Sequence, residues 1–138
     1  MPGQIDISDM KEGYEFAPAR IVLDRSEVAK YIKATGETSD LYRGTGIVPP
    51  MAVAANAMAS LGTSISLPPG SVHVGQVLEF LDTASIGDTL VSISKVTRNQ
   101  KRGKLHMLTV DMHVHKQDNK PLLFSQTSFI LPQGAEGR

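Results

Sequence analysis

The chain contains neither cysteine nor tryptophan in its 138 residues. Without a thiol, it can form no disulfide, no thiolate nucleophile and no zinc-thiolate site. Aromatic residues make up only 5% of the sequence, which weakly disfavours the stacking platforms that proteins use to bind single-stranded nucleic acid. These absences remove thiol chemistry as a class of function and leave nucleic-acid binding a weak candidate.

Charge of one sign and long apolar runs are also missing. Lys plus Arg and Asp plus Glu each number 14. The chain therefore has no excess positive charge that would attract it to nucleic acid or to an anionic membrane. No apolar run approaches transmembrane length, and residues 1–10 are polar and acidic, unlike a secretory signal. We expect a cytoplasmic protein with one domain over residues 1–138, its termini loose at 1–12 and 132–138.

One uncharged stretch organises the rest of the chain. Residues 47–62 read IVPPMAVAANAMASLG, with prolines that suit the first turn of a helix and with Gly62 placed as its left-handed end. Residues 51–61 have only Asn56 and Ser60 as polar side chains, so we predict a helix buried all round. Its length of about 16 Å is roughly half a bilayer, so protein must surround it.

Two shorter elements precede this helix. Residues 14–23 are largely apolar around a proline, which predicts an edge strand. Asp24 and Glu27 have the spacing of a capping box, and the apolar positions that follow predict a short amphipathic helix ending before Gly36. The polar loop 37–46 then leads into the buried helix, and loops held by a rigid scaffold often carry function.

After this helix the pattern becomes that of strands. Four are predicted, over residues 72–81, 89–98, 104–116 and 122–131, with a corner at 85–88 and turns at 99–103 and 117–121. Strict alternation in the third strand places Leu108, Val110, Met112 and Val114 on one face. Short turns predict an antiparallel meander, and curling it around the apolar helix gives an α+β domain.

Four strings carry a family resemblance: TGETSDLY at 35–42, GIVPPM at 46–51, HVGQ at 73–76 and IGDTL at 86–90. The first two resemble the overhang segment of MaoC-like hydratases and dehydratases. The third resembles the strand after the helix in the dehydratase N-terminal subgroup, and the fourth resembles a corner found widely in hot-dog proteins. The resemblance implies the hot-dog fold, an antiparallel sheet wrapped around a central buried helix.

The MaoC resemblance also implies an activity, the hydration or dehydration of an enoyl or 3-hydroxyacyl thioester of coenzyme A or an acyl-carrier protein. Residue by residue, Glu37 falls at the family's catalytic aspartate and Tyr42 at its catalytic histidine. A carboxylate can still accept a proton from water, whereas a phenol suits donation to the carbonyl. Asn56, a donor facing the thioester cavity together with Ser60, is the third catalytic candidate.

Further substrate-binding candidates are Asp40, His73 and the helix start at Pro50, Met51 and Ala52, where a backbone N–H and the helix dipole would polarise the thioester carbonyl. Each candidate also has an ordinary structural interpretation. Carboxylates in a polar loop are usually solvated, and one asparagine in a core is usually a hydrogen-bonded structural group.

Histidines on the third predicted strand give a weaker signal. Asp111, His113 and His115 share one face, but side chains on one strand point in parallel, whereas a metal ion needs them to converge. We therefore favour the polar outer face of the sheet and predict no metal and no cofactor. His106 falls on the apolar face, which is typical of a buried or interface histidine.

Partners and alternative functions follow from the same features. One hot-dog sheet leaves open edges and a half-covered helix, so we expect a homodimer or a heterodimer with a homologous hot-dog subunit. The missing histidine favours an alternative function, a non-catalytic acyl-binding subunit that partners an active MaoC-like chain. A further alternative is a hot-dog acyl-CoA thioesterase in which Glu37 activates water.

Overall fold

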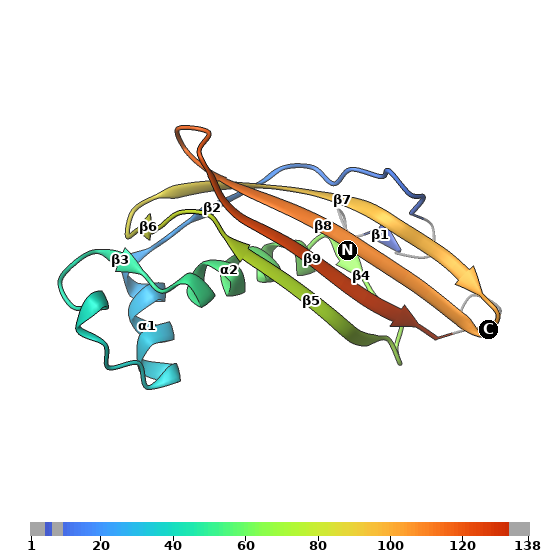
Figure 1. Ribbon diagram of the computed structural model, residues 1–138, viewed down its shortest axis with the longest axis horizontal. Coiled ribbons are helices and arrows are strands. Elements are labelled where there is room, and N and C mark those ends of the chain that lie inside the picture. The colour runs from blue at the N-terminus through green and yellow to red at the C-terminus, as the bar shows by residue number, and fades with distance from the viewer. Residues whose placement is uncertain (1–4, 7–9, 133–138) are drawn as a thin grey trace.

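The computed structural model describes residues 5–6 and 10–132. Its elements are β1 (Ile5–Asp6), β2 (Ala19–Val22), α1 (Arg25–Thr35), the 3-10 helix η2 (Asp40–Tyr42), β3 (Ile47–Val48), α2 (Pro50–Gly62), β4 (Ile65–Ser66), β5 (Val72–Phe80), β6 (Ala84–Ser85), β7 (Thr89–Arg102), β8 (Leu105–Lys116) and β9 (Pro121–Leu131). A five-stranded antiparallel sheet in the order β2-β7-β8-β9-β5 curves around α2 (Figure 1). One sheet wrapped around one helix agrees with the α+β prediction.

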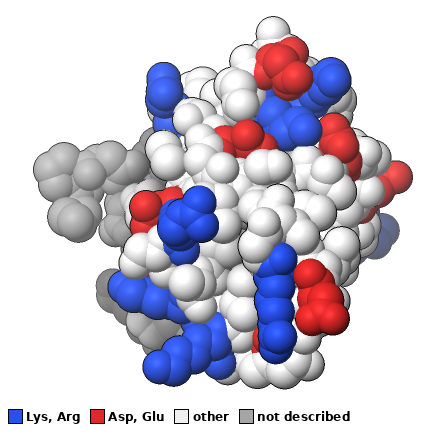
Figure 2. All heavy atoms as spheres, turned by 90° about the vertical axis from the view of Figure 1, so that its left-hand side faces the viewer, with Lys and Arg blue, Asp and Glu red and all other residues white. Residues whose placement is uncertain are grey.

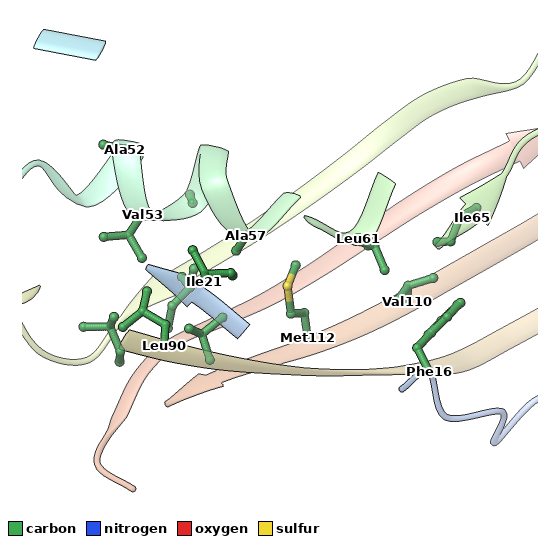
Figure 3. Close-up of a cluster of buried hydrophobic side chains, with 14 of the residues drawn as sticks. Phe16, Ile21, Ala52, Val53, Ala57, Leu61, Ile65, Leu90, Val110 and Met112 are labelled. Carbon is green, nitrogen blue, oxygen red and sulfur yellow. The ribbon is translucent and has the colours of Figure 1, made fainter. Parts of the chain in front are cut away.

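The core lies between the inner face of the sheet and one side of α2 (Figure 3). Val53, Ala57 and Leu61 of the helix point toward the sheet, where Leu90 and Met112 are at most 1% exposed. The predicted alternation in β8 is confirmed, because its four inward side chains are all buried. Burying each such large apolar side chain contributes about 2 kcal/mol before entropy is counted, so these contacts fix the helix on the sheet.

The prediction that α2 is buried all round is wrong within one chain, because a single sheet covers only one side of it. Met51 is 50% exposed, and Ala59 is exposed as well. The prediction for Gly62 is also wrong, since it is the last helical residue rather than a left-handed cap. The Thr63 hydroxyl and N–H instead donate to the Ser60 carbonyl, at 2.7 and 3.2 Å, which satisfies it without a left-handed residue.

Helix α1 begins and ends as predicted. The Asp24 carboxylate caps it by accepting the Glu27 N–H at 3.3 Å, and Gly36 ends it with a left-handed φ of 69°, a conformation that costs glycine little. Val28 is the one fully buried side chain of α1 among the described residues. The helix is therefore attached to the body through a narrow apolar face, with Tyr31 and Ile32 half-buried beside it.

Strand order differs from the predicted simple meander. β7, β8 and β9 do follow one another as hairpins, but β5 pairs with β9 instead of β7. The reason is that residues 81–88 cross the end of the sheet, where β6 pairs with β3. β7 also continues through the predicted turn at 99–103 and reverses only at Gly103 and Lys104. β2 and β5 are thus the two outer strands of the sheet. The edge strand predicted over residues 14–23 is confirmed for residues 19–22, which form β2.

The segment before β2 is attached to β7. Asn99 holds it: its side-chain amide donates to the Met10 carbonyl, and its backbone N–H donates to the Glu12 carboxylate at 3.1 Å. The Asn99 Oδ1 lies 2.5 Å from Nε2 of His106, which is 4% exposed and so is the buried histidine that was predicted. Most of the termini predicted to be loose, 1–12 and 132–138, lies outside the described residues. No helix in the described part of the chain is long and apolar enough to span a membrane.

Candidate active site

Residues 37–46, here called the overhang, extend with α1 past one end of the sheet (Figure 1). Glu37 begins the overhang directly after Gly36, and its side chain is exposed. Its Oε2 accepts the Ser39 N–H at 3.0 Å, and its own N–H donates to the Ile32 carbonyl at 3.1 Å. Glu37 is therefore a solvent-facing carboxylate whose position is set by its immediate neighbours in the chain.

Tyr42 ends η2 and is half-buried. It lines a cavity of about 390 Å³ between the overhang and α1, together with Arg25, Ile32 and Ile86. The loop around it is held by Thr45, whose hydroxyl donates to the Leu41 carbonyl at 2.6 Å. A phenol and a guanidinium thus share one cavity. The sequence could not predict that Arg25 lies beside this loop, because the two come together only when α1 packs against the rest of the chain.

Asp40 forms an exposed ion pair. Its carboxylate lies 3.8 Å from the Arg43 guanidinium, and the two side chains are 94% and 71% exposed. Exposed pairs of this kind are worth at most about 1 kcal/mol. Figure 2 views this end of the molecule and shows acidic and basic side chains interspersed, with no continuous field of one sign.

The start of α2 offers one backbone donor. The Ala52 N–H donates to the Pro49 carbonyl at 2.9 Å, so it is committed to the helix, and Pro50 has no N–H. Among the described residues, the Met51 N–H has no acceptor. This N–H lies at the positive end of the helix dipole, where a developing negative charge on an oxygen would be stabilised.

Asn56 and Ser60 lie one turn apart on the same side of α2, and both are half-buried. The Asn56 amide donates to the Ala52 carbonyl of its own helix at 2.8 Å. Among the described residues, no hydrogen bond reaches its Oδ1. Asn56 can therefore present a carbonyl oxygen to a ligand, while its N–H is partly occupied by the helix.

A polar cluster beneath α2 was not predicted from the sequence. The Gln76 side chain on β5 donates to the Ser125 hydroxyl at 2.8 Å and accepts from the Thr127 hydroxyl at 3.1 Å. Both hydroxyls also lie beside the Met58 sulfur, at 3.9 and 3.6 Å. Because these residues are some fifty positions apart in sequence, only strand pairing brings them together.

An apolar cavity of about 300 Å³ opens beyond Met58, at the C-terminal end of α2. Leu61, Leu67 and Phe129 are among the side chains that line it. Its size and lining suit a hydrocarbon chain, and apolar pockets of this kind are typical ligand sites.

The predicted site residues are brought together only in part. Glu37, Asp40 and Tyr42 share the overhang, and Pro50, Met51 and Ala52 share the helix start. No hydrogen bond or ion pair within the described ranges joins Glu37, Tyr42 and Asn56 to one another. His73 lies at the start of β5, the end of the strand remote from the overhang (Figure 1).

The outer face of the sheet carries the predicted polar histidines. Asp111 accepts from the Thr97 hydroxyl at 3.2 Å and from the Gln126 amide at 3.0 Å. His113 packs on Phe124, with ring centroids 5.0 Å apart. Within residues 5–6 and 10–132, no three His, Asp or Glu side chains are grouped so that they could hold a metal ion.

Among the described residues, one carboxyl group has a clearly shifted pKa. The Thr83 N–H donates to Asp82 at 2.7 Å, and the Lys116 ammonium lies 3.1 Å from the same carboxylate. The backbone hydrogen bond, followed by that to Lys116 and its charge, holds the pKa of Asp82 below the usual 3.8. Lys116 also donates to the Thr83 carbonyl at 3.0 Å, so this group fixes the link between β5 and β6.

The chain is similar to known proteins in sequence and in structure. The sequence matches the profile described as "FAS1-like, dehydratase domain region" over residues 11–124. No protein of curated function matches it. The (R)-hydratase from A. caviae involved in PHA biosynthesis has a similar fold, with 19% identity, a TM-score of 0.74 and coverage of 90% of this chain and 98% of that one.

Two further structures resemble the chain. The MaoC-like dehydratase from Rhodospirillum rubrum shows 18% identity and a TM-score of 0.71, over 91% of this chain and 95% of that one. The C-terminally truncated HadBC (3R-hydroxyacyl-ACP dehydratase) complex from Mycobacterium tuberculosis shows 14% identity and a TM-score of 0.70, over 90% and 99%. At these identities the likeness establishes the fold, which is the predicted hot-dog fold. The profile match covers most of the chain, and the chain therefore belongs to the FAS1-like dehydratase domain region family.

Proposed function

We propose that the protein adds water to, or removes it from, enoyl and 3-hydroxyacyl thioesters of coenzyme A or an acyl-carrier protein. The observation that carries this proposal is the placement of Glu37, an exposed carboxylate at the position where the family's overhang has an aspartate. The Met51 N–H at the start of α2 supplies a donor for the thioester oxygen. The family match supports the reaction class, and the substrate is inferred from these groups.

In hydration, the Glu37 carboxylate accepts a proton from water as the oxygen attacks Cβ of the enoyl group. Negative charge then develops on the thioester oxygen, where the Met51 N–H and the helix dipole stabilise it. The Tyr42 hydroxyl or the Asn56 side chain orients the water or the carbonyl. Asp40, Pro50, Ala52, Ser60 and His73 complete the proposed substrate contacts.

The biological unit is proposed to be a dimer joined through β5. This strand is an outer edge of the sheet, and Val72, Val74 and Val77 on it are 48–54% exposed. An exposed, apolar edge strand is a template for pairing with another strand. A second hot-dog chain would also cover the open side of α2. Location in the cytoplasm remains a prediction from sequence composition.

A second function is favoured by one observation, the tyrosine at position 42 where the family has its histidine. In that case the chain binds the acyl group while a homologous partner performs the chemistry. HadBC, one of the similar structures, is described as a complex with 3R-hydroxyacyl-ACP dehydratase activity.

One set of assays separates the proposals. Purified protein is mixed with crotonyl-CoA and with a longer enoyl-CoA, and the absorbance of the enoyl thioester, the release of free thiol and the heat of binding are recorded. Loss of the enoyl absorbance without thiol release supports a hydratase. Thiol release supports a thioesterase, and binding without turnover supports an acyl-binding subunit; either result contradicts the proposed activity.

A further inference from the structure

Two contacts hold the His73 ring in one orientation. Its Nε2 lies 3.0 Å from the Gly75 carbonyl oxygen, and its ring packs on Phe129 with centroids 5.3 Å apart. A carbonyl oxygen can only accept, so Nε2 carries the proton and Nδ1 keeps its lone pair. A ring whose tautomer and orientation are both fixed is the form in which histidine acts as a general base.

The overhang itself lacks such a group. Residues 37–46 contain no histidine, and Tyr42 stands at the corresponding position. A phenol is a poor proton acceptor near neutral pH. Hydration and dehydration involve one proton at oxygen and another at Cα, so a second group that exchanges protons is needed beside Glu37.

The open edge of β5 provides a route by which His73 reaches an overhang. When two copies of one strand pair about a two-fold axis, they run antiparallel, so the start of one strand lies against the end of the other. Pairing along all of β5 places Gln76 near the axis. His73 then lies against the Leu78–Phe80 end of the second copy.

That end of β5 is close to the helix start and the overhang. β5 leads into β6, which pairs with β3 immediately before α2. In Figure 1 the open edge of β5 faces the lower side of the picture, and α1 lies at the left, on the side toward which the arrow of β5 points. His73 also shares the inner, helix-facing side of the sheet with Phe129. The ring therefore lies at the edge where a second copy would pair, on the side of the sheet where the substrate would lie.

We propose that His73 of each chain completes the active site of a second copy, where it exchanges the proton on Cα of the substrate. This inference rests on the proposed hydratase/dehydratase function. In dehydration, Nδ1 of neutral His73 takes the Cα proton, the Cβ–oxygen bond breaks, and the protonated Glu37 gives its proton to the departing hydroxide, which leaves as water. Solvent then returns the proton from His73 to Glu37. Hydration runs through the same steps in reverse.

The first test uses variants that keep the local packing. His73→Gln retains an N–H able to reach the Gly75 carbonyl, and His73→Phe retains the stacking on Phe129, but neither has a basic nitrogen. Both should keep the wild-type unfolding temperature and lower kcat by about 10²–10⁴-fold. His113→Gln is the matched control, because His113 packs on Phe124 in the same way but on the outer face. It should keep wild-type kcat.

The second test asks whether the two residues act from different chains. Glu37→Gln and His73→Gln chains are unfolded together, refolded and assayed. If each site draws Glu37 from one copy and His73 from the other, mixed dimers have one intact site, and the mixture regains about one quarter of wild-type activity.

Every outcome bears on the proposal. Regain in the mixture, with both single variants inactive, supports it. Full activity of His73→Gln and His73→Phe, or no regain in the mixture, overturns it while the proposed function stands. A wild-type protein that turns over no enoyl thioester overturns both.

Discussion

The sheet with α2 and the overhang are stabilised in different ways. Within the sheet and α2, hydrogen bonds join residues far apart in sequence, such as Gln76 and Ser125 at 2.8 Å. In the overhang, the hydrogen bonds of Glu37, Ser39 and Thr45 all stay within five residues. The comparison teaches that stability is concentrated in the first region, whereas the second region holds Glu37, the exposed carboxylate that we propose as the proton acceptor.

The largest expected effect tests the first half of this comparison. Leu90→Ala removes a fully buried side chain and should lower the free energy of unfolding by about 2–5 kcal/mol. Leu41→Ala removes a side chain in the overhang that is 55% exposed, and should change it by less than about 0.5 kcal/mol. Urea denaturation measures both. Similar losses of unfolding free energy in the two variants would contradict the claim that stability is concentrated in the sheet and α2.

The next largest effect is expected at the open edge of the first region, along β5. Val77 is 50% exposed in the middle of that strand, so Val77→Lys places a charge in the proposed dimer interface and should weaken the dimer at least tenfold, or about 1.4 kcal/mol. Ile93→Lys, at a site 40% exposed on the inner strand β7, is the control and should leave the dimer intact. Sedimentation equilibrium measures both, and a wild-type monomer would disprove the interface.

A smaller effect is expected at the link between the two regions. Asp24→Ala removes the cap of α1 and should destabilise that helix by about 1 kcal/mol. Because the overhang follows α1, hydrogen exchange should accelerate in residues 25–46 while β8 remains protected. Ser26→Ala, in the first turn of the same helix, should have little effect. Uniform acceleration across the sheet would show that α1 and the sheet unfold as one unit.

The smallest effect concerns pH. The pKa of Asp82 is lower in the folded chain than its usual 3.8, so the unfolded chain binds the proton more readily. This carboxylate therefore stabilises the fold above that pH, and the contribution is lost as pH falls through the usual value toward the folded one. Asp82→Asn should make unfolding less steeply dependent on pH below about 4, as measured by thermal melts. An unchanged dependence would show that neither the Thr83 N–H nor Lys116 lowers the pKa of Asp82.

Much of the fold could be predicted because its signals are local. Alternation in β8 identified the buried face, and the spacing of Asp24 and Glu27 identified the start of α1. Pairing of β5 with β9 was missed, because alternation shows which face is buried and not which strand is adjacent. The predicted β7 was too short, because the polar residues at its end were interpreted as a turn. In the structure Asn99 lies within the strand and bonds to Met10 and Glu12, and these contacts form only in the folded chain.

The candidate site could be predicted only where its residues are close in sequence. Glu37, Asp40 and Tyr42 fall in one loop and remain together in the structure. Arg25 in the Tyr42 cavity and the Gln76 cluster were missed, because both require segments that meet only in the folded chain. The burial of α2 was overestimated for a related reason: an uncharged helix indicates that something covers it, but does not say whether the same chain does so.

The most direct test of the account is Glu37→Gln. Glutamine keeps an oxygen that can accept the Ser39 N–H but cannot take a proton from water. We predict a loss of kcat for enoyl-thioester hydration of about 10²-fold or more, with the unfolding temperature unchanged, because the side chain is exposed and bonded only locally. Wild-type kcat in the variant would contradict the assignment of chemistry to the overhang. A large drop in unfolding temperature would contradict the separation of chemistry from stability.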